Sequence, residues 1–300
     1  MANLAARVGV LGMRQCPPRT PSAAWRANRS GSGPHRPGTS LGFRNRGTSV
    51  PTASRLRQGR SRLLTQLAAD ISWSSASVEK KEQVGKDRFK FILDVGSDLA
   101  QGYTIPGQYV QVRCDEEQKP AFIALANAPA HQSSLVEMVI KTNDGTAGAL
   151  CALGEGAEVD VSPVMGKGFP VEERAPLDTC KDVYLIATGT GIAPIRALIN
   201  SGALNIKNRD SVALLYGYKD KDHCAYSEEF GAWEEMGIKL SSAESEGPDG
   251  IYVTDILTKE KLENPESVVA IIAGQWELAG TIEEYFKEQG VPEGRVLTNF

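Results

Sequence analysis

Hydrophobic positions follow a period of two in the first half of the chain, between residues 74 and 176. Tyr109-Val-Gln-Val-Arg113 alternates between apolar and polar side chains, which is typical of a β-strand with one buried face. Turn residues such as Pro106-Gly107 separate the apolar runs. Strands are therefore expected at residues 89–95, 109–113, 120–126, 135–141 and 157–163, with one short helix near 147–153. Short strands at this spacing predict a small antiparallel β-barrel.

The second half, residues 180–300, alternates fully apolar runs with segments of helical spacing. Runs at 183–187, 211–217 and 268–273 predict buried strands, with shorter strands at 238–240 and 295–300. Helices are expected after residue 193 and at 226–236, 253–262 and 276–289. Strands that alternate with helices predict an α/β domain with a parallel, doubly wound sheet. Ligands of such sheets bind beyond the carboxyl ends of the strands, so the loops 188–194, 217–226 and 273–277 are expected to face a site.

The segment 183–199 reads as a strand, a glycine-rich turn and a helix. Its turn consists of Gly189, Thr190, Gly191, Ile192, Ala193 and Pro194. Proline suits the first turn of a helix, where backbone N–H groups lack internal partners and attract anions. Two glycines without Cβ atoms would let a phosphate approach the backbone, which indicates a pyrophosphate cradle. The alternative is a tight turn that only needs glycine, because Gly-x-Gly is shorter than the full dinucleotide fingerprint.

The longer string Gly189-Thr-Gly-Ile-Ala-Pro194, with Arg196 after it, resembles the nicotinamide-nucleotide loop of the ferredoxin–NADP reductase superfamily. Three further segments resemble the same superfamily, in particular its divergent, fruit-protein-like plant and algal group: Ile105-Pro-Gly-Gln-Tyr-Val110, Val164-Met-Gly-Lys-Gly-Phe169 and the ending Thr298-Asn-Phe300. The resemblance implies a flavin-reductase type barrel followed by an NAD(P)-binding domain. It also implies an oxidoreductase that passes electrons from NAD(P)H through a flavin to an acceptor, which the sequence does not identify.

The flavin motif of this family departs most from the expected pattern. Where the family carries Arg-x-Tyr-Ser, this chain has Ala121, Ile123 and Ala124. A second flavin-phosphate segment, which normally offers Ser or Thr at a helix start, reads Gly145-Thr-Ala-Gly148. Gly148 stands where the hydroxyl would be, so Gly145 and Thr146 are the candidates, with Thr146 expected to cap the helix. FAD thus remains a cofactor candidate without its usual side chains, and a flavin-less NAD(P)-binding regulator or scaffold is the alternative function.

Three further positions take a flavin or nicotinamide role by resemblance. Phe300 matches the terminal aromatic residue that lies on the flavin in plant reductases, or it packs in the last strand. Gly274 and Gln275 belong to Ala273-Gly-Gln-Trp-Glu-Leu278, which resembles the family's Cys-Gly-Pro string beside the nicotinamide. Ala273 replaces the cysteine there. Trp276 is expected in the core at a helix start, and a stacking surface is the alternative. No side chain is assigned a catalytic role, because hydride transfer needs no acid or base.

The loop after the second parallel strand is assigned to the adenosine end of the nucleotide. Tyr226 begins Tyr226-Ser-Glu-Glu-Phe230, which matches the family's Tyr-x-x-Glu-Phe string. Lys219 and Lys221 favour the 2′-phosphate of NADP, although Asp220 and Asp222 oppose it. A solvated loop of mixed charge is the alternative interpretation.

The charge of the chain is divided unevenly. Residues 1–69 contain twelve arginines and no lysine, aspartate or glutamate, and they are rich in Ser, Gly and Pro. This composition predicts a transit peptide, with the chloroplast as destination and the mitochondrion as the alternative. A basic arm for nucleic acid is a further interpretation. The remaining residues carry 21 basic and 37 acidic side chains, a net charge of −16, which disfavours nucleic acid as a partner of the processed chain.

Other site classes find little support in the composition. The five cysteines form no Cys-x-x-Cys pair and only three histidines are present, so no metal site is expected. No run of 18 apolar residues occurs, so no membrane-spanning helix is expected.

Overall fold

The computed structural model describes residues 71–130, 132–259 and 261–299. The predicted transit peptide and the predicted role of Phe300 therefore lie outside the described residues. Both sheets belong to one structural unit.

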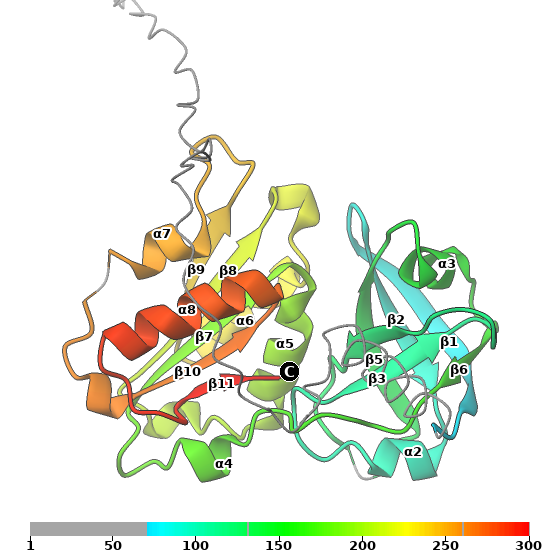
Figure 1. The fold of residues 1–300 in the computed structure, drawn as a ribbon, viewed down its shortest axis with the longest axis horizontal. Helices are drawn as coiled ribbons and strands as arrows, with labels where there is room; N and C mark the ends of the chain where they lie inside the picture. Colours follow the sequence, from blue (N-terminus) through cyan, green and yellow to red (C-terminus); the bar gives the residue numbers. More distant parts are fainter. Residues whose placement is uncertain (1–70, 131, 260, 300) are drawn as a thin grey trace, which may run out of the picture. The chain divides into compact units, whose positions relative to one another are not determined.

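The first sheet is antiparallel and has six strands in the order β4-β3-β6-β1-β2-β5 (Figure 1). Its two edge strands approach each other, because the Ala126 N–H donates to the Glu137 carbonyl at 2.7 Å and Leu125 bridges to Met138. The sheet therefore curls into a barrel, as predicted. Its elements are β1 (Ser74–Gly85), β2 (Arg88–Asp94), α2 (Ser97–Gln101), β3 (Tyr109–Arg113), β4 (Ala121–Ala124), β5 (Leu135–Lys141), α3 (Thr146–Ala152) and β6 (Glu158–Val161).

The strand β1 is the main element of this sheet that the sequence pattern does not predict. Only Ala76 and Val78 are buried in it, and the run from Glu79 to Gln83 is polar. The strand forms nevertheless, because it pairs with β2 along most of its length and with β6 at its start. Backbone hydrogen bonds on both sides thus hold a strand whose side chains give no alternating signal.

The second sheet is parallel, with strand order β11-β10-β7-β8-β9. Apolar side chains of α5 and α6 pack on one face of it, and those of α7 and α8 pack on the other. Figure 1 shows α7 and α8 in front of this sheet. The predicted doubly wound α/β architecture is confirmed. The elements are α4 (Val171–Arg174), β7 (Asp182–Thr188), α5 (Ile192–Ser201), β8 (Ser211–Tyr218), α6 (Phe230–Glu235), β9 (Ile238–Glu244), α7 (Val253–Leu257), β10 (Val268–Ala273), α8 (Trp276–Glu288) and β11 (Val296–Thr298).

Short 3₁₀ turns connect several of these elements. They are η1 (Gly189–Gly191), η2 (Ile206–Asn208), η3 (Lys221–His223), η4 (Ser227–Glu229) and η5 (Pro265–Ser267). The helix expected at 226–236 is thus divided into η4 and α6, and the helix expected at 253–262 ends at Leu257. Leu262 lies in a loop, and its side chain is buried. Its apolar character therefore extended the helical pattern beyond the true end of the helix.

Arg196 on α5 joins the α/β domain to the barrel. Its Nη1 donates to the Glu137 carboxylate on β5 and to the Ala126 carbonyl, both at 3.0 Å, and its Nε donates to Glu229 at 2.7 Å. The guanidinium lies 4.6 Å from the Tyr226 ring centre. Burial lowers the pKa of Arg196, but the carboxylates raise it further, so the net shift is upward. These partly buried ion pairs hold α5, which carries the glycine-rich turn at its start.

Candidate functional site

A cleft of about 990 Å³ lies where the carboxyl ends of the parallel strands meet the barrel wall. This volume falls at the upper end of the range of about 300–1,000 Å³ for ligand sites. The α/β domain contributes residues 188–191, 217–219 and 273–275, and the barrel contributes 121–124 and 139–141. The three predicted site-facing loops therefore do reach one cleft, although the later residues of the loops 217–226 and 273–277 do not line it.

Gly189 is open toward the cleft. Its φ is +55°, a conformation that favours glycine, and a Cβ built there would meet only Arg88 Nη2, at 3.8 Å. The Tyr216 hydroxyl donates to the Gly189 carbonyl at 3.1 Å and fixes the turn. Burial raises the pKa of Tyr216, so this hydroxyl stays protonated as a donor. The turn thus exposes backbone of the kind that an anion can approach.

The structure requires glycine at position 191 for packing, whereas the sequence predicted that it makes room for a phosphate. A Cβ on Gly191 would lie 2.2 Å from the carbonyl oxygen of Ala273, at the end of β10. The missing side chain therefore allows the turn to pack against backbone, rather than allowing a phosphate to approach. Gly191 still lines the cleft, through its backbone.

The remaining residues of the predicted cradle divide into two groups. Thr190 and Pro194 line the cleft. Ile192 and Ala193 are buried in the core beside the sheet and supply packing for α5. Pro194 is the third residue of α5 and lies in its first turn, as predicted.

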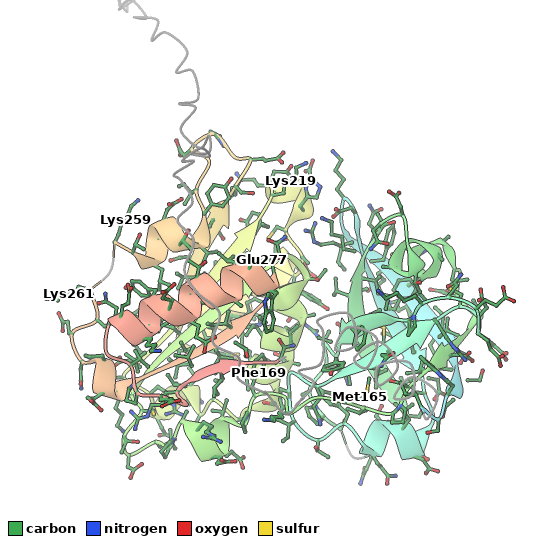
Figure 2. The ribbon with its side chains drawn as sticks, viewed as in Figure 1. Met165, Phe169, Lys219, Lys259, Lys261 and Glu277 are labelled. Carbon is green, nitrogen blue, oxygen red and sulfur yellow. The ribbon has the colours of Figure 1, made fainter. Side chains whose placement is uncertain are left out.

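At the neighbouring strand ends, Gly274, Gln275 and Lys219 line the cleft. The Gln275 N–H donates to the Thr188 hydroxyl at 3.3 Å, which ties the ends of β7 and β10 together. Lys219 lies just beyond the end of β8 and pairs with Glu246 at 3.1 Å (Figure 2). Both partners are well exposed, so this ion pair is weak and leaves the ammonium available to a ligand.

Tyr226 does not fit the role at the adenosine end that its motif predicts. It is 1% exposed, and its hydroxyl donates to the Glu137 carboxylate at 2.7 Å. Burial and that carboxylate raise the pKa of the phenol. Tyr226 is not among the residues that line the cleft. The Tyr-x-x-Glu-Phe string therefore anchors the barrel to the α/β domain through Glu137 and Arg196.

Neither Gly145 nor Thr146 lines the cleft, and Thr146 does not cap α3 as predicted. Its hydroxyl donates to the Lys119 carbonyl at 2.6 Å. Asn143 takes the capping position instead, because its Oδ1 accepts from the N–H groups of Gly145 at 2.8 Å and Gly148 at 3.3 Å. Two of the N–H groups at this helix start are thus already engaged by a side chain.

The strand β4 presents a different face to the cleft than the flavin motif assumes. Ile123 is buried in the barrel core and Ala121 packs against that core, so these two side chains point inward. Phe122 and Ala124 lie on the opposite face. The rings of Phe122 and Tyr109 are 5.8 Å apart, centre to centre, and both line the cleft. The barrel therefore offers an aromatic wall without any Arg, Tyr hydroxyl or Ser on β4.

The charged side chains that line the cleft are all positive. Among the residues that line it, Arg88, Lys141 and Lys219 carry positive charge and none is acidic. Of these, the sequence interpretation named only Lys219. Arg88 and Lys141 begin and end strands, where a basic residue carries no distinguishing sequence signal. Tyr109, Phe122, Tyr218 and Tyr252 also line the cleft and were not predicted as site residues.

Trp276 is a further correction, because it is exposed by 68% rather than buried in the core. Its position at the start of α8 places it beside Gln275, away from the buried face formed by Ala279, Ile282 and Phe286. Within the part of the chain that the structure describes, no cluster of three potential metal ligands occurs and no helix is long and apolar enough to span a membrane.

Comparison with known proteins agrees with this architecture. A sequence model of the oxidoreductase NAD-binding domain matches residues 185–284. The fruit protein pKIWI502 of Actinidia deliciosa is 29% identical over 225 residues, which cover 70% of this chain and 71% of that protein. The electron transfer subunit of dihydroorotate dehydrogenase B (NAD(+)) from Shouchella clausii is 27% identical over 192 residues, covering 62% of this chain and 69% of the subunit.

A solved structure shares the two-domain fold. The ferredoxin NADP+ reductase from Neisseria gonorrhoeae, with bound FAD and NADP, superposes with a TM-score of 0.64 at 16% identity. The match covers 75% of this chain and 97% of that one. With an antiparallel six-stranded barrel, a parallel five-stranded sheet and a match to the oxidoreductase NAD-binding domain at residues 185–284, the chain has the two-domain fold of the ferredoxin–NADP reductases.

Proposed function

We propose that the chain binds a nicotinamide dinucleotide in the cleft and uses it for electron transfer to an acceptor. The charge of the cleft carries this proposal: residues 70–300 have a net charge of −16, yet the charged cleft-lining residues are all basic. A local positive surface in an acidic protein favours an anionic ligand. The site also lies at the carboxyl ends of β7, β8 and β10, where parallel sheets bind nucleotides.

The protein's part in such a reaction is to bind and orient. A bound nicotinamide supplies a hydride, which is two electrons and one proton, to an acceptor that stacks against it. Gly189 and Thr190 offer backbone to the diphosphate, and Gly274 and Gln275 border the same cleft at the end of β10. The apolar wall of Tyr109 and Phe122 offers a surface for a planar acceptor and reduces access of water.

FAD in its usual binding mode does not fit the residues of this barrel. Ala121 and Ile123 point into the barrel core, and Asn143 engages two N–H groups at the start of α3. The aromatic wall would suit a flavin ring, but the diphosphate would find no arginine on β4, and at the start of α3 two N–H groups are already engaged by Asn143.

The same observation favours a second candidate function. A chain that binds the dinucleotide without a flavin would act as an NAD(P)-dependent regulator or scaffold. The Asn143 cap and the inward position of Ala121 support this candidate, because both remove the flavin-phosphate contacts while leaving the nucleotide loop intact.

One set of measurements on the purified full chain separates these functions. Absorbance is recorded before and after addition of FAD and desalting, NADPH and NADH are titrated, and their oxidation with ferricyanide is assayed. Nucleotide binding with turnover supports the oxidoreductase, and flavin bands that survive desalting would show that flavin is held by another route. A colourless protein that binds NADPH without turnover would support the regulator, and absence of nucleotide binding would contradict both candidates.

We also propose that the chain acts in the chloroplast, with the mitochondrion as the alternative, because residues 1–69 hold twelve arginines and no acidic residue. A fusion of residues 1–69 to a fluorescent protein tests this proposal. Import into plastids, with loss of a segment of this size, is the expected result. Retention in the cytosol would contradict it.

A further inference from the structure

Arg88, the first residue of β2, has an unusual environment for an arginine. It is 4% exposed, and its Nε is the only buried side-chain nitrogen or oxygen without a hydrogen-bond partner among residues 71–130, 132–259 and 261–299. Buried polar groups in proteins are nearly always paired, so an unpaired donor of a charged group indicates a missing partner. Arg88 lines the cleft, which is where that partner would come from.

The guanidinium is oriented by its neighbours. Its Nη1 pairs with the Asp87 carboxylate, which leaves Nε and Nη2, the two donors of the opposite edge. Nη2 lies 3.8 Å from the position that a Cβ of Gly189 would occupy. An arginine edge with two parallel donors matches two oxygens of a phosphate group. The open edge of Arg88 is therefore next to the glycine-rich turn of the other domain.

The charges around Arg88 leave a positive excess. Asp87 bears one negative charge, and it contacts both Arg88 and the Lys141 ammonium, the latter at 3.6 Å. One carboxylate cannot neutralise two cations, and no acidic residue lines the cleft. The β1–β2 turn that precedes Arg88 is held against the α/β domain, because the Lys86 N–H donates to the Asp222 carbonyl at 2.7 Å.

We propose that Arg88 binds the diphosphate of the nicotinamide dinucleotide from the barrel side, opposite the turn at Gly189. This assignment rests on the proposed function and adds to it a positioning residue from the other domain. The diphosphate then lies between backbone of the α/β domain and a side chain of the barrel. Nucleotide binding consequently depends on both domains, although the NAD-binding motif lies in only one.

Ligand titration of four full-length proteins tests the assignment: the wild type, Arg88→Gln, Arg88→Lys and Asp87→Asn. Kd values for NADPH and NADH are measured by calorimetry, with no acceptor present. Arg88→Gln is expected to raise both Kd values at least about tenfold, because a charge-assisted contact to phosphate is lost. Asp87→Asn removes the partner that orients Nη1 but keeps the arginine and its open edge, so its Kd values should rise clearly less than those of Arg88→Gln.

Two smaller probes separate a phosphate contact from a structural effect. ADP carries the diphosphate, whereas adenosine 2′-monophosphate does not. Arg88→Gln and Arg88→Lys should both weaken the binding of ADP and leave the binding of adenosine 2′-monophosphate unchanged. Arg88→Lys keeps the positive charge, so it still provides the test if Arg88→Gln does not fold. Equal weakening of both probes, or ADP binding equal to wild type, would overturn the assignment.

The outcomes also separate this inference from the proposed function. A wild type that binds neither NADPH nor NADH defeats the proposed function itself. If the wild type binds both nucleotides and Arg88→Gln binds them equally tightly, only the role of Arg88 is contradicted. If Arg88→Gln loses FAD retention but keeps NADPH affinity, the arginine serves a flavin diphosphate and the assignment to the nicotinamide nucleotide is wrong.

Discussion

The two glycines of the nucleotide turn provide a matched pair of substitutions. Gly191→Ala is expected to lower the free energy of unfolding by about 1–3 kcal/mol, because its Cβ would collide with the Ala273 carbonyl. Gly189→Ala costs about 1–2 kcal/mol for the positive φ, but its Cβ has room. The added methyl group at Gly189 would stand in the cleft, where the diphosphate is proposed to lie. We therefore expect Gly189→Ala to weaken nucleotide binding more than Gly191→Ala does. Urea unfolding and NADPH titration check both, and the reverse order of affinities would contradict the distinction.

Lys219 is the residue on which a preference for NADP would rest. It lines the cleft and its pair with Glu246 is weak and exposed. We expect the wild type to bind NADPH more tightly than NADH, and Lys219→Gln to weaken NADPH by a factor of about five while leaving NADH unchanged. Lys221→Gln is the control, because Lys221 lies in the same loop but not along the cleft. A preference that survives Lys219→Gln would exclude the lysine as its cause.

Single residues show where sequence reasoning succeeds and where it stops. The turn at Gly189 was found because glycine spacing after an apolar strand is a local signal. Arg88 was not found, because its place beside that turn depends on a contact between residues 101 positions apart. The motif that begins at Tyr226 is present, but it does not reveal that the hydroxyl is engaged by Glu137 on a strand that is distant in the sequence.

At the scale of elements, the start of α3 depends on Asn143. Asn143→Ala removes the acceptor for two N–H groups and is expected to lower the free energy of unfolding by about 1 kcal/mol. Asn143→Asp keeps an acceptor in place and should retain most of that stability. Chemical denaturation of the two variants, with hydrogen exchange of the Gly145 and Gly148 amides, measures the effect. Equal losses in both variants would show that Asn143 is not the cap.

Elements were predictable where side-chain periodicity matched burial. The strand at 135–141 was predicted with its observed bounds, since Val136, Met138 and Ile140 alternate into the barrel core. The strand β1 was missed because its stability comes from two paired neighbours rather than from its own side chains. β9 extends to Glu244, beyond the apolar residues that marked its start, because β8 pairs with it along its full length. Pairing of this kind is not encoded in a local pattern.

At the scale of the whole molecule, Arg196 links the barrel to the α/β domain. Arg196→Met leaves the partly buried Glu229 without its cation and Glu137 with only the Tyr226 hydroxyl, and it is expected to lower the free energy of unfolding by about 2 kcal/mol. The control is Arg174→Met, because the Arg174–Glu173 pair is exposed and its loss should change stability by less than about 1 kcal/mol. Urea unfolding of both compares them directly. A loss in Arg196→Met no larger than in the control would show that the pair does not join the domains.

Gly148 has a consequence for how this barrel can change by mutation. A Cβ at this position would lie 1.8 Å from the Asn143 carbonyl oxygen, so any side chain requires the loop to move first. A serine or threonine at position 148 would therefore displace the Asn143 backbone, and with it the hydrogen bonds from Gly145 and Gly148 to the Asn143 side chain. A hydroxyl for a flavin phosphate at this helix start thus requires a second, compensating change in the loop.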